Sequence, residues 1–495
     1  MPQFTIGVDI GTTGTKTVLV DVDGGRILAQ ASRDTRLFAD ATGHAEADPA
    51  QWLANVHDTV REVLAASQVP TGDVGALATT GMVPAVVPVD RSGTPTRRAM
   101  LQNDSRATTE IELLRTRLDA ATVLAATGSA VTQQSVAPTA MWLRTNEPDT
   151  WERTARLVGS YDWVLMALGA APHVELNWSI ESGLGTLGGQ PYQPMFAAAD
   201  LDEGIQPTIL TPGARVGVLS DDAAAATGLP AGLPLIVGGA DHVLSAYAAG
   251  VNSAGDWLVK LGGAGDVLAA SDEPVVDARL YLDAHPVPGR WLPNGCMATS
   301  GSLIRWFQTL AGGPDLLELD ADAAVRGPAE ILCLPYFLGE KSPLHDPDLR
   351  GAFVGLDLAH TRADMYRSVL EAVAFGFKHH TEVFADIGVV LRRAMVTNGG
   401  SKSTLWKQIL ADVLDTELWP IVGHPGASLG AAVIAAVGAG MIDGWDGTER
   451  FLTLGDPVVP DQRHVPHYAD AYAQWRTLGD VLTPVSHRLA RKARA

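Results

Sequence analysis

Two glycine-rich turns, placed half a chain apart, constrain the fold of this sequence more than any other feature. The first, "DIGTTGTK", contains Gly11 and Gly14, and the second, "LGGAGD", contains Gly262 and Gly265, 251 residues later in both cases. Each turn joins two β-prone runs, which predicts a hairpin at each place. Single hydrophobic cores stop growing at roughly 250–300 residues. A chain of 495 residues that repeats a hairpin at mid-length is therefore expected to form two α/β domains.

The first forty residues predict a three-stranded antiparallel meander. Phe4, Ile6 and Val8 alternate up to Asp9, and "KTVLVDV" and "RILAQAS" supply two further β-prone runs around a "DGG" turn. A second meander is expected over residues 256–271. The repeat places an N-terminal domain at 1–247 and a C-terminal domain at 248–495. We expect their two glycine turns to face a common ligand cleft, since ligands favour domain interfaces.

The first long helix is expected to begin directly after the first meander. Asp48 suits the N-cap, Pro49 suits the first turn, and Gln51 has the spacing of a capping box. Near the other end of the chain, residues 426–442 are dominated by Ala and Gly and span about 17 residues, the short limit for crossing a membrane. They predict a buried helix that packs closely through its small side chains, and only as an alternative a membrane span.

Charge and cysteine content exclude several classes of partner. The 56 Asp and Glu against 36 Lys and Arg give a net charge of -20, which argues against nucleic acid or an anionic membrane as the main partner. The only cysteines, Cys296 and Cys333, are too few for a disulfide framework, so a cytoplasmic protein is expected. Met1 to Phe4 show no secretory leader. Oligomeric state stays open, with a homodimer as one assembly.

The first glycine turn has the composition of a phosphate-binding nest. Backbone N–H groups and the hydroxyls of Thr12 and Thr13 can converge on phosphate oxygens. Asp9, at the strand end, suits Mg²⁺, and Lys16 can reach a phosphate as a point charge. The alternative is structural, because Gly-Thr turns are common and Asp9 can simply end a strand.

Two further segments carry chemistry. In "LPLIVGGADH", a β-prone run delivers Asp241 to a helix start, where it is either a catalytic base or an N-cap. The adjacent His242 is either a ligand contact or a packed histidine. In "VTNGGSKST", Gly399 and Gly400 precede a helix and let a flat ligand approach the backbone. That segment is not a P-loop, because Ser401 stands where the motif requires Lys.

Together these segments resemble the FGGY family of carbohydrate kinases, within the actin-like ATPase superfamily, and most closely its xylulokinase-type branch. The resemblance spans nearly the whole chain. It is carried by seven ordered segments: "DIGTTGTK", "EADPAQW", "GGADH", "LGGAGD", "CLPYFLGEKSPLHDPDLRGAFVGL", "TNGGSKSTLWKQILADVL" and "GASLGAAVIAAVGAG".

The resemblance implies two ribonuclease-H-like domains and transfer of the ATP γ-phosphoryl group to a sugar or polyol hydroxyl. Asp241 is implied as the general base and Asp9 as a Mg²⁺ contact. The residues implied to bind ATP are Thr12, Thr13, Lys16, Gly262, Gly263 and Gly265 at the phosphates, with Gly399, Gly400 and Ser403 at the adenine. Those expected at the sugar are Met82, Asn103, Asp104, Asp241 and His242.

The sequence departs from the xylulokinase-type pattern at three positions. Val83 stands where that branch carries His, Gln102 where Trp is usual, and Thr139 where the family commonly has Lys. D-xylulose is the leading substrate, and another ketose or a polyol is the alternative. Two rival functions are a member that binds sugar and nucleotide without turnover, and an actin-like chaperone or filament. The chaperone or filament would need a peptide-binding domain or a polymer interface, which no segment suggests.

Overall fold

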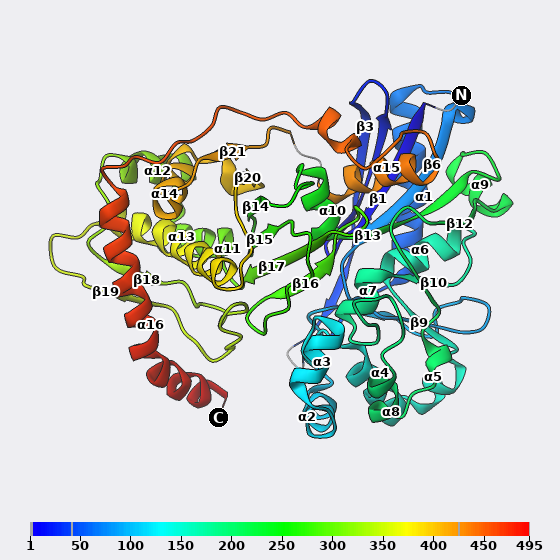
Figure 1. Ribbon diagram of the computed structural model, residues 1–495, viewed down its shortest axis with the longest axis horizontal. Helices are drawn as coiled ribbons and strands as arrows, with labels where there is room; N and C mark the ends of the chain where they lie inside the picture. The colour runs from blue at the N-terminus through cyan, green and yellow to red at the C-terminus, as the bar shows by residue number, and fades with distance from the viewer. Residues whose placement is uncertain (1–2, 41–42, 424–425, 495) are drawn as a thin grey trace. The chain divides into compact units, whose positions relative to one another are not determined.

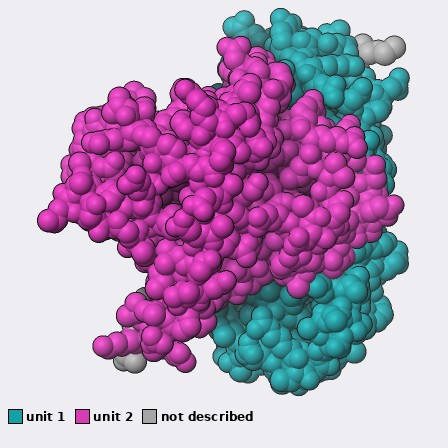
Figure 2. Space-filling view, turned by 60° about the vertical axis from the view of Figure 1, so that its left-hand side comes forward, with its two compact units in different colours: residues 1–252, 282–292, 425–452 teal, residues 253–281, 293–424, 453–495 magenta. Residues whose placement is uncertain are grey.

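The computed structural model describes residues 3–40, 43–423 and 426–494, so Met1 and Pro2 lie outside the described residues. Contacts divide the chain into two compact units (Figures 1 and 2). Unit 1 contains residues 1–252, 282–292 and 425–452, and unit 2 contains residues 253–281, 293–424 and 453–495.

Unit 1 is built on a six-stranded sheet that opens with the predicted meander. Its strands, in spatial order, are β12 (Arg215–Val218), β13 (Pro234–Ala240), β6 (Val74–Gly81), β1 (Phe4–Ile10), β2 (Gly14–Asp21) and β3 (Arg26–Asp34). β1, β2 and β3 pair antiparallel, which confirms the meander, whereas β6 is parallel to both β1 and β13.

A second six-stranded sheet repeats this topology. Its order is β16 (Tyr281–Ala284), β17 (Trp291–Met297), β15 (Gly265–Ala269), β14 (Asp256–Leu261), β20 (Arg393–Thr397) and β21 (Leu418–Pro420). β14 and β15 form the predicted second hairpin, and β20 runs parallel to β14 and β21. In both sheets an antiparallel meander is extended by parallel strands on the side of its first strand. This is the ribonuclease-H-like arrangement that the resemblance implied.

Smaller sheets and the helices complete the two units. The minor strands are β4 (Leu37–Ala39), β5 (Ala45–Ala47), β7 (Val87–Val89), β8 (Ala99–Met100), β9 (Arg156–Val158), β10 (His173–Glu175), β11 (Thr208–Leu210), β18 (Leu332–Leu334) and β19 (Ala352–Val354). The helices of unit 1 are α1 (Pro49–Ser67), α2 (Thr108–Arg117), α3 (Ala120–Thr127), α4 (Val136–Asn146), α5 (Pro148–Arg153), α6 (Ser160–Leu168), α7 (Leu176–Glu181), α8 (Gln193–Ala199), α9 (Asp221–Thr227), α10 (Asp241–Ala248) and α15 (Ala427–Gly438). Those of unit 2 are α11 (Gly301–Leu310), α12 (Leu316–Ala324), α13 (Arg362–Asp386), α14 (Thr404–Leu414) and α16 (Val465–Arg494).

Helix α15 packs directly against the sheet of unit 1 through small residues. A Cβ added to Gly7 of β1 would overlap the backbone oxygen of Ser428, and one added to Gly430 would overlap that of Leu244 in α10. Thr5 Oγ1 donates to Ala432 O at 2.7 Å across the same contact. The close packing predicted for this segment is therefore confirmed. Of the helices that the structure describes, none is long and apolar enough to cross a membrane.

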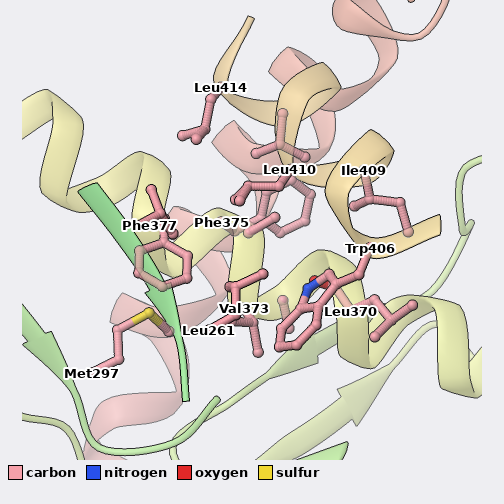
Figure 3. Close-up of a cluster of buried hydrophobic side chains, with 14 of the residues drawn as sticks. Leu261, Met297, Leu370, Val373, Phe375, Phe377, Trp406, Ile409, Leu410 and Leu414 are labelled. Atoms are coloured by element: carbon pink, nitrogen blue, oxygen red, sulfur yellow. The ribbon is translucent and has the colours of Figure 1, made fainter. Parts of the chain in front are cut away.

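The core of unit 2 gathers around α13, whose side chains are buried on several faces. Figure 3 shows this cluster, with Leu370, Val373 and Phe377 from α13 and Trp406 from α14. The Trp406 indole Nε1 donates to Leu370 O at 3.2 Å, so this buried polar atom is satisfied. The core thereby joins α14 firmly to α13.

Two expectations differ from the structure. Asp48 does cap α1 by accepting from Ala50 N, but the capping box is absent, because the Gln51 side chain accepts instead from Arg36 N. The domain division at residue 247 also differs from the compact units. Residues 425–452, which include α15, group with unit 1 because their small side chains pack on β1.

Gly7→Ala should destabilise the protein, because the added methyl has no room between β1 and α15. Overpacking of a tight core lowers the free energy of unfolding by about 1–3 kcal/mol. Gly72→Ala is the matched control, since nothing lies within 4 Å of its Cβ position. Thermal or denaturant unfolding should show a loss for Gly7→Ala alone. Equal stability of both variants would contradict the close contact.

Candidate active site

Three parallel strands of unit 1 bring their carboxyl ends to one edge of the sheet. The register pairs Asp9 of β1 with Thr80 of β6, and Thr80 with Gly239 of β13. Met82 and Asp241, which follow β6 and β13, therefore emerge on the same edge as the first glycine turn. Ligands of open α/β sheets bind outside the carboxyl ends of the strands.

The first glycine turn joins a carboxylate and an ammonium group across two strands. Asp9 and Lys16 are register partners on β1 and β2, and both are half-buried. Burial lowers the pKa of Lys16, and the charge of Asp9 opposes that shift. At the tip of the turn, Thr12 is half-buried and Thr13 is exposed. The turn thus offers hydroxyls at its tip and one charge of each sign at its base.

A polar contact joins the turn to the segment after β6. Thr12 Oγ1 lies 3.7 Å from Met82 Sδ, and Gln102 Nε2 donates to Thr12 Oγ1 at 3.4 Å. Gln102 Oε1 is buried and has no hydrogen-bond partner among the described residues. A buried acceptor without a protein partner costs free energy. Gln102 Oε1 therefore offers an acceptor to a ligand.

Asn103 and Asp104 are both predicted to contact the sugar. Asn103 is exposed, whereas Asp104 is half-buried and hydrogen-bonded within the protein. The Asp104 carboxylate accepts from Ala45 N at 2.7 Å and from Arg106 N, Nε and Nη2 at 2.6 to 3.1 Å. These four bonds match the acceptor capacity of a carboxylate. Arg106 also binds Glu46. Asp104 thus holds this segment in shape, and sugar contacts by Asn103 and Asp104 stay predictions.

Asp241 is the first residue of α10 and is not its N-cap. Ala240 occupies the N-cap position and no side chain caps the helix there, so the N-cap alternative is wrong. The Asp241 side chain keeps 40% of its surface exposed. A carboxylate at a helix start that does not cap the helix is available to a ligand.

His242 lies in a group of carboxylates. Its Nε2 is 2.8 Å from Asp283 Oδ2, a hydrogen-bond distance that places a proton between the two atoms. Its Nδ1 is 3.5 Å from Asp241 Oδ1, and Glu181 Oε1 is 3.8 Å from Nε2. Glu181 and Asp283 were missed by the sequence analysis, because they belong to α7 and β16 and no motif links them to Asp241.

The protonation of this group follows from burial and charge. Burial would lower the pKa of His242, but Asp283, Asp241 and Glu181 together raise it well above its ordinary value. Burial, reinforced by the charges of Asp283 and Asp241, raises the pKa of Glu181 well above its ordinary value. Burial and the neighbouring charges therefore favour the protonated forms of both the His242 imidazole and the Glu181 carboxyl group.

Unit 2 contains a cavity of about 610 Å³ at the corresponding edge of its own sheet. Lys260 of β14 is paired with Thr397 of β20, so the loops that follow both strands meet at this edge. The walls combine glycine backbone and apolar side chains with the charged residues Arg305, Asp320 and Lys402. The lining includes Leu261, Gly262, Gly263, Gly301, Ile304, Leu317, Tyr366, Asn398, Gly399, Gly400, Ser403 and Trp406. Five of the predicted ATP-binding residues therefore share one cavity, and Gly265 lies outside its lining.

The glycine pair in this cavity has two different environments. A Cβ at Gly400 would overlap the Trp406 ring and lie 2.6 Å from Leu261 Cβ, whereas a Cβ at Gly399 would meet nothing within 4 Å. Ser403 lines the cavity and also caps α14 by accepting from Trp406 N at 3.0 Å. Gly400 is thus needed for packing, and Gly399 leaves the backbone open to a ligand.

Comparison with known proteins decides the family. Models of the N-terminal and C-terminal domains of the FGGY family of carbohydrate kinases match residues 4–248 and 250–439. The chain belongs to this family. It is therefore a carbohydrate kinase.

Several relatives of this FGGY kinase match over nearly their full length. It is 25% identical to a xylulose kinase of Bacillus subtilis, over 96% of each chain. It is 23% identical to a gluconokinase of the same organism, over 99% of this chain and 96% of the relative. The crystal structure of a xylulose kinase from Rhodospirillum rubrum is 39% identical, with a TM-score of 0.91 over 98% of this chain and 100% of that one. These matches confirm the predicted fold of two actin-like ATPase domains.

Proposed function

We propose that this kinase transfers the γ-phosphoryl group of ATP to a hydroxyl of a ketopentose such as D-xylulose, with Asp241 as general base. The observation that carries the proposal is the placement of Asp241. Its side chain does not cap α10 and is accessible, and it lies at the sheet edge that also presents Asp9 and Met82. Similarity to xylulose kinases supports the substrate class.

The chemistry assigned to Asp241 is a single proton transfer. The acceptor hydroxyl oxygen forms a bond to the γ-phosphorus, the bond from that phosphorus to the ADP oxygen breaks, and the hydroxyl proton passes to the Asp241 carboxylate. Phosphoryl transfer of this kind depends mainly on positioning and on neutralisation of charge. A base that acts late in a loose transition state does not require a high pKa.

The nucleotide is assigned to groups in each unit. The adenine would lie against Gly399, Gly400 and Ser403, where the cavity of unit 2 has open backbone and apolar walls. The phosphates are assigned to the glycine loops, namely Thr12, Thr13 and Lys16 in unit 1 and Gly262, Gly263 and Gly265 in unit 2. The half-buried Asp9 carboxylate at the end of β1 fits a hard cation such as Mg²⁺, which would neutralise phosphate charge when bound.

A second substrate class follows from the residues that depart from the xylulokinase-type pattern. Val83 is 6% exposed and offers no hydrogen bond where xylulokinase-type members carry His, while Gln102 offers a buried acceptor close to Thr12. A site whose polar groups match different hydroxyls discriminates strongly between sugars. Together with Thr139, these departures make another ketose or a polyol the alternative substrate.

ADP release should depend on sugar when the purified protein is given ATP, Mg²⁺ and a panel of ketoses, aldoses, polyols and sugar acids. Turnover is expected with a ketopentose, D-xylulose first. Turnover only with a different class of sugar would overturn the ketopentose assignment. Binding of sugar and nucleotide without turnover on any member would favour the non-catalytic alternative.

Asp241→Asn should abolish turnover while ATP binding stays nearly unchanged, because the amide cannot accept the hydroxyl proton and contributes nothing to the assigned nucleotide site. Loss of a general base lowers kcat by about 10²–10⁴-fold. Steady-state kinetics and calorimetric titration with ATP measure the two effects. Turnover within tenfold of the unmodified protein would remove Asp241 from the base role.

Gly399→Ala should weaken ATP binding without changing thermal stability, since its methyl would enter open cavity space that the adenine is proposed to occupy. We expect about a tenfold increase in the Kd for ATP, or about 1.4 kcal/mol. Gly400→Ala is the comparison, because its Cβ would overlap Trp406 and should lower Tm. Unchanged ATP affinity in Gly399→Ala would place the adenine elsewhere.

A further inference from the structure

The residue after the proposed base is held from three directions by acidic groups, all within unit 1. The groups that face His242 are Asp241 on its own helix, Glu181 at the end of α7 and Asp283 on β16. Asp283 is fully buried, at 1% exposure, whereas Glu181 and His242 keep 14% and 21%. Each ring nitrogen of His242 therefore has a carboxylate oxygen within 4 Å, and a sugar contact by His242 stays a prediction.

A second histidine in unit 1 shows what this arrangement changes. His173 is also buried beside a carboxylate, with its Nε2 3.6 Å from Asp162 Oδ1. Its Nδ1 faces the carbonyl oxygen of Ala171 at 2.8 Å, and burial lowers its pKa to about 4. Burial raises the pKa of Asp162 well above its ordinary value, so this acid does not offset the effect of burial on the pKa of His173. His242 faces three acidic groups and has a direct 2.8 Å contact with one of them.

We propose that His242 is a positioning residue for Asp241: an imidazolium anchored through Nε2 to Asp283, whose Nδ1–H directs Oδ1 of the Asp241 carboxylate. The contact of 3.5 Å from Nδ1 selects Oδ1, which leaves Oδ2 to accept the proton of the sugar hydroxyl. The inference rests on the proposed role of Asp241 as base.

The imidazolium of His242 would also reduce the repulsion between two carboxylates that the fold brings together. Without it, Asp241 and Asp283 would place two negative charges near each other at the edge where an anionic phosphate must be transferred. Like charges in a partly buried site repel strongly. An imidazolium between them offsets this repulsion and holds the Asp241 carboxylate in place, and Asp283 anchors that imidazolium from the interior.

The first test measures the charge of His242 directly and needs no activity. NMR titration of the full-length protein with labelled histidine, assigned by His242→Gln, should show a His242 pKa well above that of an ordinary histidine. Asp283→Asn should lower the midpoint of that titration by about one unit or more, since a neighbouring opposite charge is removed. A neutral ring at pH 7 in the unmodified protein would overturn the proposal.

The second test asks whether that charge serves catalysis. His242→Gln keeps a donor toward Asp283 but loses the one toward Asp241, and should lower kcat by about 10–100-fold with the KM for ATP unchanged. In Asp283→Asn, the loss of activity at alkaline pH should begin at lower pH than in the unmodified protein. Asp283→Glu, which restores a carboxylate, should return the profile toward that of the unmodified protein.

Matched controls separate these effects from simple damage to the fold. His464→Asn removes a His–carboxylate pair of 3.1 Å in unit 2, and should alter neither kcat nor the pH profile. Each variant is compared by thermal unfolding. A pH profile that is identical in Asp283→Asn and the unmodified protein would mean that the pair of His242 and Asp283 has a structural role and does not serve catalysis.

Asp241→Asn distinguishes failure of this inference from failure of the proposed function. If Asp241→Asn retains turnover, the base assignment fails, whatever the state of His242. If Asp241→Asn abolishes turnover but His242→Gln leaves kcat unchanged, the base assignment stands and the positioning role alone is overturned. Loss of turnover in Asp241→Asn and the lower kcat of His242→Gln, together with the shifted His242 titration in Asp283→Asn, support both.

Discussion

The parallel register of β1, β6 and β13 is the constraint on which the chemistry of unit 1 depends. It aligns Asp9, Thr80 and Gly239 in one row, so that the segments following each strand leave the sheet together. The register is held by contacts that admit no side chain. Cβ atoms at Gly238 of β13 and Gly7 of β1 would overlap Thr79 O and Ser428 O, respectively. The position of Asp241 therefore depends on backbone packing several residues away.

Charge is distributed so that the acidic protein can handle a phosphoryl group. A net charge of -20 repels anions at long range. Within unit 1, however, burial raises the pKa values of Glu181 and Asp162 well above their ordinary values, which favours the uncharged form of both acids. Lys16 and His242 supply positive charge close to Asp9 and Asp241. Local arrangement, rather than net charge, governs this edge of the sheet.

The sequence predicted those parts of the fold whose signals are local. The meanders of unit 1 and unit 2, the start of α1 and the small-residue helix α15 follow from alternation, turn residues and composition over short windows. The prediction that was wrong also rested on a local signal, which a tertiary contact overrode. Gln51 had the spacing of a capping box, yet its side chain binds Arg36 N, because β3 and β4 bring that backbone within reach.

For the site, the sequence by itself determined the identity of the glycine loops and of Asp241, since these motifs are contiguous and their chemistry is carried by backbone and by one carboxylate. Only the tertiary structure decided what surrounds them. It placed Glu181 and Asp283 around His242, engaged Asp104 with Arg106, and left Gln102 Oε1 buried without a partner among the described residues. Such contacts join segments far apart in the chain, and their strength depends on burial and on distances of a few ångströms, which no sequence spacing encodes.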